Sequence, residues 1–355
     1  MIESTFRPTL PVLRTATVML AILLVCGGGC ASNLVDPMEL PDELIAVQWW
    51  ENEDARRRKE IEARFEGGGQ ARRREGVMDL NRFGSRGANA ADPNALNRYP
   101  GKLALINPRT GEITFPEQTP PGAKPLSWSA DRRRLLFSSS RQNGRFQIFE
   151  LDFDTLEVRL LTGSRGNILA AAHGPNGSFV YSEVQMNDAG ELQLEIVKNS
   201  ADNRDELLAD DAAARHLSYS RDGRQVAYAP YDLRSIAGGA TSAPRIVVQD
   251  LTPGGAKRQI GVGEHPIFSP DGSWIIYSAR RGENRVSYRV RPDGSGRTAL
   301  GIGVRSEETP AVSPDGNFVI YISEHNGLDR LFVKRFDGSG DRLLFDDATV
   351  GWPVW

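Results

Sequence analysis

Six residues stand at two neighbouring positions of a repeated sequence phrase, and together they mix cationic, anionic, imidazole and aromatic side chains. They are Arg215, His216, Glu264, His265, Glu308 and Trp352. Such a set could form a charged mouth that binds a protein or a peptide, or it could be ordinary solvated loop residues. Two histidines beside a carboxylate could also bind a metal ion, although sequence alone gives no coordination geometry.

The phrase that would position these residues returns at nearly constant spacing. It reads Ser-Trp-Ser-Ala-Asp, Gly-Pro-Asn-Gly, Ser-Arg-Asp-Gly and twice Ser-Pro-Asp-Gly, and its markers are Asp131, Asn176, Asp222, Asp271 and Asp315. The steps are 45, 46, 49 and 44 residues, within the period of about 40 to 50 residues typical of a four-stranded propeller blade. Because Pro presets one turn angle, Asp accepts from nearby amides and Gly allows a left-handed backbone, each phrase predicts a turn between two strands.

The rest of each repeat predicts two more strands. Segments rich in alternating Val, Ile, Leu or Phe follow each hairpin, at residues 146–152, 192–198, 245–251, 285–291 and 330–336. A turn and a short outer strand come next, for example at 157–161 and 341–345. Each repeat is therefore expected to form one four-stranded sheet.

The two ends of the chain supply one further repeat. Residues 351–355 match the openings of the inner strands, whereas 102–106 and 112–115 read as outer strands without an inner partner. We therefore predict an all-β fold, a six-bladed propeller over residues 98–355 that is closed by a composite blade from both termini. For the second strand of that blade only residues 95–99 offer a candidate.

Residues 30–97 are expected to lie outside the propeller as a helix and a flexible tether. The segment 43–65 is rich in helix formers and ends at three glycines, and 70–97 has few large apolar groups. An early apolar group should make this helix dock on the outside of the propeller, with a membrane surface or a partner groove as alternatives. That group is Leu44, Ile45, Val47, Trp49 and Trp50.

The first 29 residues have the layout of a secretory signal. Arg7 and Arg14 precede an apolar stretch at 17–26 and three glycines. Cys30 then resembles the lipidated cysteine of bacterial lipoproteins, which implies a membrane anchor and an envelope location facing the periplasm, on the outer membrane. Ordinary cleavage after Ala31 is the alternative. Because both cysteines lie within the first 30 residues, the mature chain can form no internal disulfide.

The repeat resembles the WD-like repeat of the TolB β-propeller family, most closely in residues 266–278 and 310–323. The resemblance covers roughly residues 98–355 and implies a periplasmic propeller that contacts envelope proteins through its funnel face. TolB carries a globular α/β domain ahead of the propeller, whereas residues 31–97 are short and polar here. The family fold hosts many functions.

Enzyme signatures are poor. The chain has no Gly-x-Ser-x-Gly elbow and no His-Glu-x-x-His motif, and the sequence at 301–306 lacks the third glycine of a dinucleotide loop. We expect a monomeric scaffold that binds an envelope protein or peptide and needs no cofactor, although the channel could hold a divalent cation. The alternative is a periplasmic enzyme of the glycan lyase or lactonase type. A net charge of −3 gives no electrostatic drive toward nucleic acid.

Overall fold

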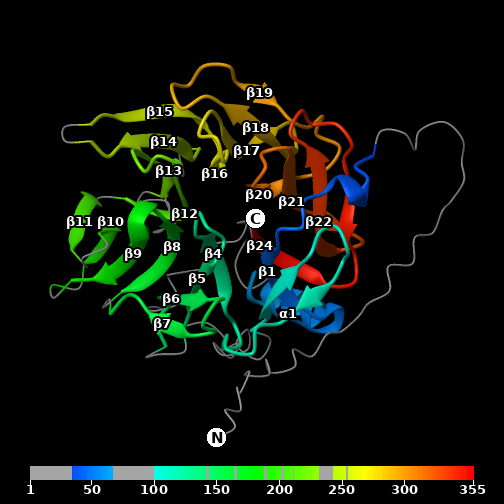
Figure 1. The fold of residues 1–355 in the computed structure, drawn as a ribbon, viewed down its shortest axis with the longest axis horizontal. Helices are drawn as coiled ribbons and strands as arrows, with labels where there is room; N and C mark the ends of the chain where they lie inside the picture. Colours follow the sequence, from blue (N-terminus) through cyan, green and yellow to red (C-terminus); the bar gives the residue numbers. More distant parts are fainter. Residues whose placement is uncertain are drawn as a thin grey trace, which may run out of the picture.

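The computed structural model describes residues 34–66, 100–140, 144–163, 166–187, 189, 191–200, 204–210, 212–231, 243–252 and 255–355. In this part of the chain, six four-stranded antiparallel sheets stand around a common axis, with one strand of each sheet nearest the axis (Figure 1). The inner strands contact one another in ring order, and the last contacts the first. The predicted all-β, six-bladed propeller is therefore confirmed.

Five sheets are built from contiguous sequence, each running outward from its inner strand. The first is β4 (Lys124–Trp128), β5 (Arg134–Ser139), β6 (Gln147–Asp152) and β7 (Val158–Leu160). The second is β8 (Asn167–His173), β9 (Phe179–Met186), β10 (Leu192–Asn199) and β11 (Asp205–Ala209). The third is β12 (Ala213–Tyr219), β13 (Gln225–Tyr231), β14 (Arg245–Asp250) and β15 (Lys257–Val262). The fourth is β16 (Glu264–Phe268), β17 (Ile275–Arg281), β18 (Asn284–Val290) and β19 (Thr298–Ala299), and the fifth is β20 (Glu308–Val312), β21 (Phe318–His325), β22 (Leu328–Arg335) and β23 (Arg342–Phe345).

The sixth sheet joins the two ends of the chain. Its strands, from the axis outward, are β24 (Thr349–Val354), β1 (Ile45–Trp50), β2 (Lys102–Ile106) and β3 (Ile113–Thr114). Ala46 is paired with Val354 on one side and with Leu105 on the other. In Figure 1 the blue strand β1 accordingly lies beside the C-terminal end of the chain. The predicted composite blade is confirmed.

The second strand of this blade was predicted wrongly. Residues 95–99 lie outside the described part of the chain, and the position is filled by β1, which we expected to be the start of a docked helix. Ile45, Val47 and Trp49 face one core and Ala46 another, so both faces of this segment are buried. This segment is buried on both faces and pairs with β2 on one edge and β24 on the other. These interactions outweigh the helix propensity of the flanking residues. The propeller therefore includes residues N-terminal to 98.

The predicted helix exists, but it is shorter. The helix α1 spans Asn52–Glu66 and connects β1 to the segment before β2. Its Lys59 Nζ donates to the Gly327 carbonyl at 3.0 Å, and Asn52 Nδ2 donates to the Asp347 carbonyl at 3.1 Å, so the helix contacts the fifth sheet and the entry to β24. Among the described residues, no helix combines the length and apolar composition needed to cross a membrane.

The repeated phrase forms the predicted turn. The Ser220 hydroxyl donates to Asp222 Oδ1, which also accepts from the Arg224 amide at 3.1 Å. Gly223 closes the turn at a φ of 68°, a left-handed conformation that favours glycine. The phrases at 269–272 and 313–316 repeat these contacts, which explains their recurrence in the sequence.

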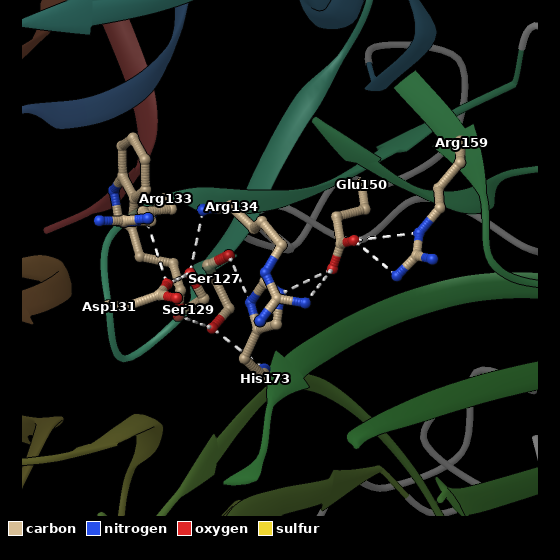
Figure 2. A network of polar contacts seen from close by, with 9 residues as sticks. Ser127, Ser129, Asp131, Arg133, Arg134, Glu150, Arg159 and His173 are labelled. Carbon is tan, nitrogen blue, oxygen red and sulfur yellow. Dashed lines mark hydrogen bonds and ion pairs between the residues drawn. The ribbon is translucent and has the colours of Figure 1, made fainter. Parts of the chain in front are cut away.

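Polar contacts bind neighbouring sheets together. His173 on β8 places Nε2 3.2 Å from Glu150 Oε2 on β6 and Nδ1 3.1 Å from the Ser127 carbonyl on β4, so both ring nitrogens face acceptors of the first sheet (Figure 2). Arg159 Nη2 lies 2.8 Å from the other Glu150 oxygen. The charge of the buried Glu150 carboxylate is thus compensated within the seam between the first two sheets.

A second seam lies between the fourth and fifth sheets. Lys334 on β22 is 1% exposed and forms an ion pair with Glu307, which is 3% exposed. Glu307 Oε2 also accepts from the Ser287 amide on β18 at 2.8 Å. One carboxylate therefore joins the backbone of one sheet to a side chain of the next.

Candidate functional site

A break in strand register on each inner strand sets the position of the axial side chains. On four strands two residues oppose a single residue of the neighbouring strand, and on the other two a single extra residue is inserted. Such β-bulges turn side chains away from the regular alternation. The paired bulge residues are Arg215 and His216, His265 and Pro266, Thr309 and Pro310, and Trp352 and Pro353.

Four side chains from four sheets meet on the ring axis, and we call them the axial cluster: Lys124, His216, His265 and Trp352. The rings of His216 and His265 lie edge to face with centroids 4.0 Å apart, and His216 stacks on Trp352 at 5.3 Å and 23°. Lys124 Nζ lies 3.2 Å from the centroid of the Trp352 ring. Because β12 and β24 belong to opposite sheets of the ring, the stack of His216 on Trp352 crosses the axis.

Three of the bulge residues have an unusual backbone conformation. His265, Thr309 and Trp352 occupy equivalent positions in three successive sheets and have φ angles of 57°, 45° and 54°. Positive φ is uncommon for residues other than glycine and costs of order 1–3 kcal/mol, most plainly for the β-branched Thr309. The fold tolerates this strain at the positions that place side chains on the axis.

The electrostatic environment of the axial cluster is cationic. Burial, with a smaller contribution from Arg215, lowers the pKa of Lys124 to about 7. Burial, followed by Arg285, Arg215 and Lys124, lowers the pKa of His265 to about 3. Burial, followed by His265, Lys124 and Arg215, holds the pKa of His216 well below its ordinary value. At neutral pH both imidazoles are therefore uncharged.

Several polar atoms here lack a hydrogen-bond partner among the described residues. They are His216 Nδ1, His265 Nδ1 and Thr309 Oγ1, and all three are shielded from solvent. In the same part of the chain no acidic side chain pairs with Lys124. Polar groups left in this state cost free energy unless a ligand or water satisfies them.

The structure brings together only part of the predicted mouth. His216, His265 and Trp352 converge. Arg215 lies close enough to contribute to the lowered pKa of three cluster members, which are Lys124, His216 and His265. Glu264 is instead bound by Arg285, whose Nη1 lies 2.6 Å from Glu264 Oε2. Glu308 is the first residue of β20 and is partly buried.

Metal ligation was the other possibility raised by these residues. Within the described ranges, no group of three or more His, Cys, Asp or Glu side chains is placed to hold a metal ion. The two histidines contact each other and Trp352, whereas the carboxylate of Glu264 is held by Arg285. The arrangement offers hydrogen-bond donors and aromatic faces to a ligand.

We call the end of the ring where the inner strands begin the mouth end. The loop between β19 and β20 leads into the first residue of β20 there, and its Ile302 and Val304 are 82% and 73% exposed. Large apolar side chains exposed near each other are typical of contact surfaces.

The first described residues lie at the opposite end of the ring. The Val35 amide donates to the Gly340 carbonyl at 3.0 Å, and the Leu34 carbonyl accepts from Arg335 at 3.4 Å. Arg335 is paired with Phe318, near the end of β20 and far from its beginning at Glu308. The N-terminal segment therefore reaches the ring at the end away from the mouth. Cys30 lies outside the described residues.

Sequence reasoning did not select Lys124, Thr309 or Arg285. Lys124 and Thr309 occupy the same two repeat positions as the predicted residues, so the signal was present in the register. Arg285 is on β18, the third strand from the axis, and no periodicity connects it with Glu264. Its role depends on the packing of β18 against β17 and of β17 against β16.

Comparisons with known proteins support the fold. No protein-family model matches the chain. The uncharacterized peptidase YuxL of Bacillus subtilis is 28% identical over 158 residues, which are 43% of this chain and 21% of that protein, so the match spans about a fifth of the relative's length. The crystal structure of TolB from Acinetobacter baumannii has a TM-score of 0.59 at 16% identity and covers 89% of this chain and 67% of its own.

A second solved structure agrees. The putative TolB of Agrobacterium tumefaciens has a TM-score of 0.54 at 20% identity and covers 69% of this chain and 88% of its own. Identities this low establish the architecture and leave the activity open. The chain therefore has a TolB-like six-bladed β-propeller fold.

Proposed function

We propose that this protein is an envelope-anchored scaffold that binds a protein or peptide at the mouth end of its propeller. The observation that carries the proposal is the convergence of Lys124, His216, His265 and Trp352 from four sheets, with polar atoms that have no partner among the described residues. The apolar pair Ile302 and Val304 at the same end supports a macromolecular ligand.

The position of Leu34 supports an orientation for this scaffold. Cys30 precedes Leu34 by four residues, a span of at most about 14 Å in an extended chain. A lipid on Cys30 would therefore hold the far end of the ring close to the membrane. The mouth end would then face away from the membrane and remain open to partners. An envelope location facing the periplasm is part of this proposal, as are the outer membrane and a monomeric state.

Photo-crosslinking in cells tests the binding face. A benzoylphenylalanine at position 302 is expected to yield crosslinked protein adducts, because this position extends from the mouth end. Position 207 is a matched control, since Leu207 is an exposed apolar residue, 54% accessible, on the outer strand β11. Equal yields from both positions would contradict binding at the mouth.

Membrane fractionation tests the anchor. The Cys30→Ser variant is expected to move from the membrane fraction to the soluble fraction, because a serine cannot carry the thioether-linked lipid. Cys26→Ser is the matched control and should stay with the membrane. A Cys30→Ser protein that still requires detergent for release would refute lipidation at this residue.

A further inference from the structure

We propose that the axial cluster is a carboxylate-binding site that receives an acidic side chain or a C-terminal carboxylate of a protein or peptide partner. This inference rests on the proposed function, because it names the chemical group that the mouth recognises. It assigns Lys124, a residue absent from the predicted mouth, as the principal charged contact.

The first argument is the inventory of donors and acceptors. The ammonium of Lys124 is a donor only, each neutral imidazole offers one N–H, and the Thr309 hydroxyl can donate as well. These groups come from β4, β12, β16 and β20, and the nitrogen or oxygen atoms His216 Nδ1, His265 Nδ1 and Thr309 Oγ1 have no partner among the described residues. The group that would complement a lysine beside such donors is an anion with two acceptor oxygens.

The second argument is charge. Elsewhere in the ring the buried cations meet carboxylates: Lys334 is paired with Glu307, and Arg285 with Glu264. Lys124 has no such partner in the described part of the chain, and the charged side chain that acts on it is another cation, Arg215. A desolvated cation beside a second cation is costly, and a bound carboxylate would offset that cost.

The third argument concerns the kind of anion. The Trp352 ring and the two imidazoles present aromatic surface beside the ammonium, with Lys124 Nζ 3.2 Å from the centroid of Trp352. An organic acid can contact these rings through its carbon chain, which inorganic phosphate cannot do. The exposed Ile302 and Val304 lie at the same end of the ring, and exposed apolar groups there favour a carboxylate carried by a polypeptide.

The backbone strain points to the same place. His265, Thr309 and Trp352 are held at positive φ, and strained residues gather at ligand-binding positions, where the fold preorganises side chains. Two of them, His265 and Trp352, contact His216 in the axial cluster, and Thr309 occupies the equivalent position on β20. The strain is therefore located where the proposed carboxylate would bind.

The experiment uses histidine resonances as reporters. The chain has only four histidines, so its ¹³C-labelled imidazole spectrum is simple. His216 and His265 report on the cluster, while His173 and His325 lie in other parts of the ring and serve as internal controls. The probes are blocked Gly/Ser pentapeptides with a central Glu, with a central Gln, or with Gln and a free C-terminal carboxylate, and also inorganic phosphate.

We expect at least one of the two carboxylate peptides to shift His216 and His265 in a saturable way, and the blocked Gln peptide to leave them unchanged. A stronger response to the Glu peptide assigns an acidic side chain, and a stronger response to the free C-terminus assigns a terminal carboxylate. Equal shifts with the Gln peptide, or with phosphate, would overturn the proposal, as would the absence of any shift at millimolar peptide.

Two variants test the residue assignments. Lys124→Met should weaken peptide binding by about tenfold to a hundredfold, the range expected for a lost charge-assisted hydrogen bond. Lys102→Met is the matched control, because Lys102 also lies over an aromatic ring, 5.7 Å from the centroid of Phe115, but in the sixth sheet's third strand from the axis. Thr309→Val should weaken binding several-fold, and unchanged affinity in both cluster variants would refute the site.

Unshifted His173 and His325 signals verify that each variant is folded. The outcome is also independent of the crosslinking test. Carboxylate binding without adducts at position 302 would support the carboxylate site and refute the binding of a protein partner at the mouth end. Adducts at position 302 without carboxylate binding would support the scaffold function and refute the carboxylate site.

Discussion

Charged side chains with little exposure to solvent occur in two regions of this propeller, and only one of these regions pairs them with opposite charges. In the seams between sheets each buried charge has a partner, as in Lys334 with Glu307 and His173 with Glu150 (Figure 2). On the axis Lys124 lies over an aromatic ring and near another cation, Arg215, and nearby polar atoms have no partner among the described residues. The charged groups named in the seams are paired within the chain, whereas Lys124 has no carboxylate partner among the described residues.

This difference separates structural polar groups from functional ones. A paired buried charge is weak evidence for binding, because its hydrogen bonds are already made. An unpaired one destabilises the fold unless a bound group compensates it, which is the role that we propose for a carboxylate ligand. The comparison can be tested by removing one charge from each region and measuring the change in the free energy of unfolding.

The largest effect is expected in the seam. Lys334→Met should lower the free energy of unfolding by about 3–5 kcal/mol, because it leaves the Glu307 carboxylate buried and uncompensated. Urea unfolding followed by circular dichroism measures the change. Adding Glu307→Leu should recover only part of the loss, since the Ser287 amide then loses its acceptor. A loss below about 1 kcal/mol in the single variant would show that the seam pair is not needed for stability.

An effect of opposite sign is expected on the axis. Lys124→Met should raise the free energy of unfolding by roughly 1–2 kcal/mol at pH 7, because it removes a desolvated cation. The gain is smaller than the pKa shift alone implies, since the Trp352 ring offsets part of the desolvation. The same denaturation experiment measures it, with Lys102→Met as the control. Destabilisation by Lys124→Met would contradict the claim that the charge of Lys124 is uncompensated in the fold.

The pH dependence of this variant follows from the same shift. The pKa of Lys124 falls from 10.5 in the unfolded chain to about 7 in the fold, so the unfolded state binds more protons between these values. The wild-type protein should therefore gain stability from this residue as pH rises from about 7 to 10.5, and the advantage of Lys124→Met should disappear over that range. Arg215, His216 and His265 face Lys124 and remain in both proteins.

The smallest effect is expected for a charge pair on the surface. Arg57 and Glu53 form an ion pair one turn apart on α1, and their side chains are 52% and 73% exposed. Arg57→Gln should change the free energy of unfolding by less than about 0.5 kcal/mol, because solvent screens the pair. A loss comparable to that of Lys334→Met would mean that exposure does not govern these differences.

Much of the fold was predictable because the repeat encodes it locally. The Ser-x-Asp-Gly turns are formed by contacts within five residues, such as those of Ser220, Asp222 and Arg224. They can therefore be predicted from a short stretch of sequence. The strand β1 could not be predicted from local sequence. Its assignment depends on β24, about 300 residues away in the sequence, whose edge it pairs with. A local pattern could not reveal that partner.

The site was predictable only in outline. The repeat register placed His216, His265 and Trp352 at equivalent positions, and these residues do meet on the axis. The register could not show that Glu264 would be bound by Arg285, or that Lys124 would extend over Trp352, because side-chain direction at a β-bulge depends on the strands packed around it.

The sequence by itself determined the number of sheets, the turns and the joining of the two ends, because a repeated unit specifies its own hairpins and leaves a recognisable remainder at each terminus. Only the tertiary structure decided which buried charges are paired. Ring closure brings β4, β12, β16 and β24 together from positions far apart in the chain, and the balance of charge at their meeting point exists only once they are assembled.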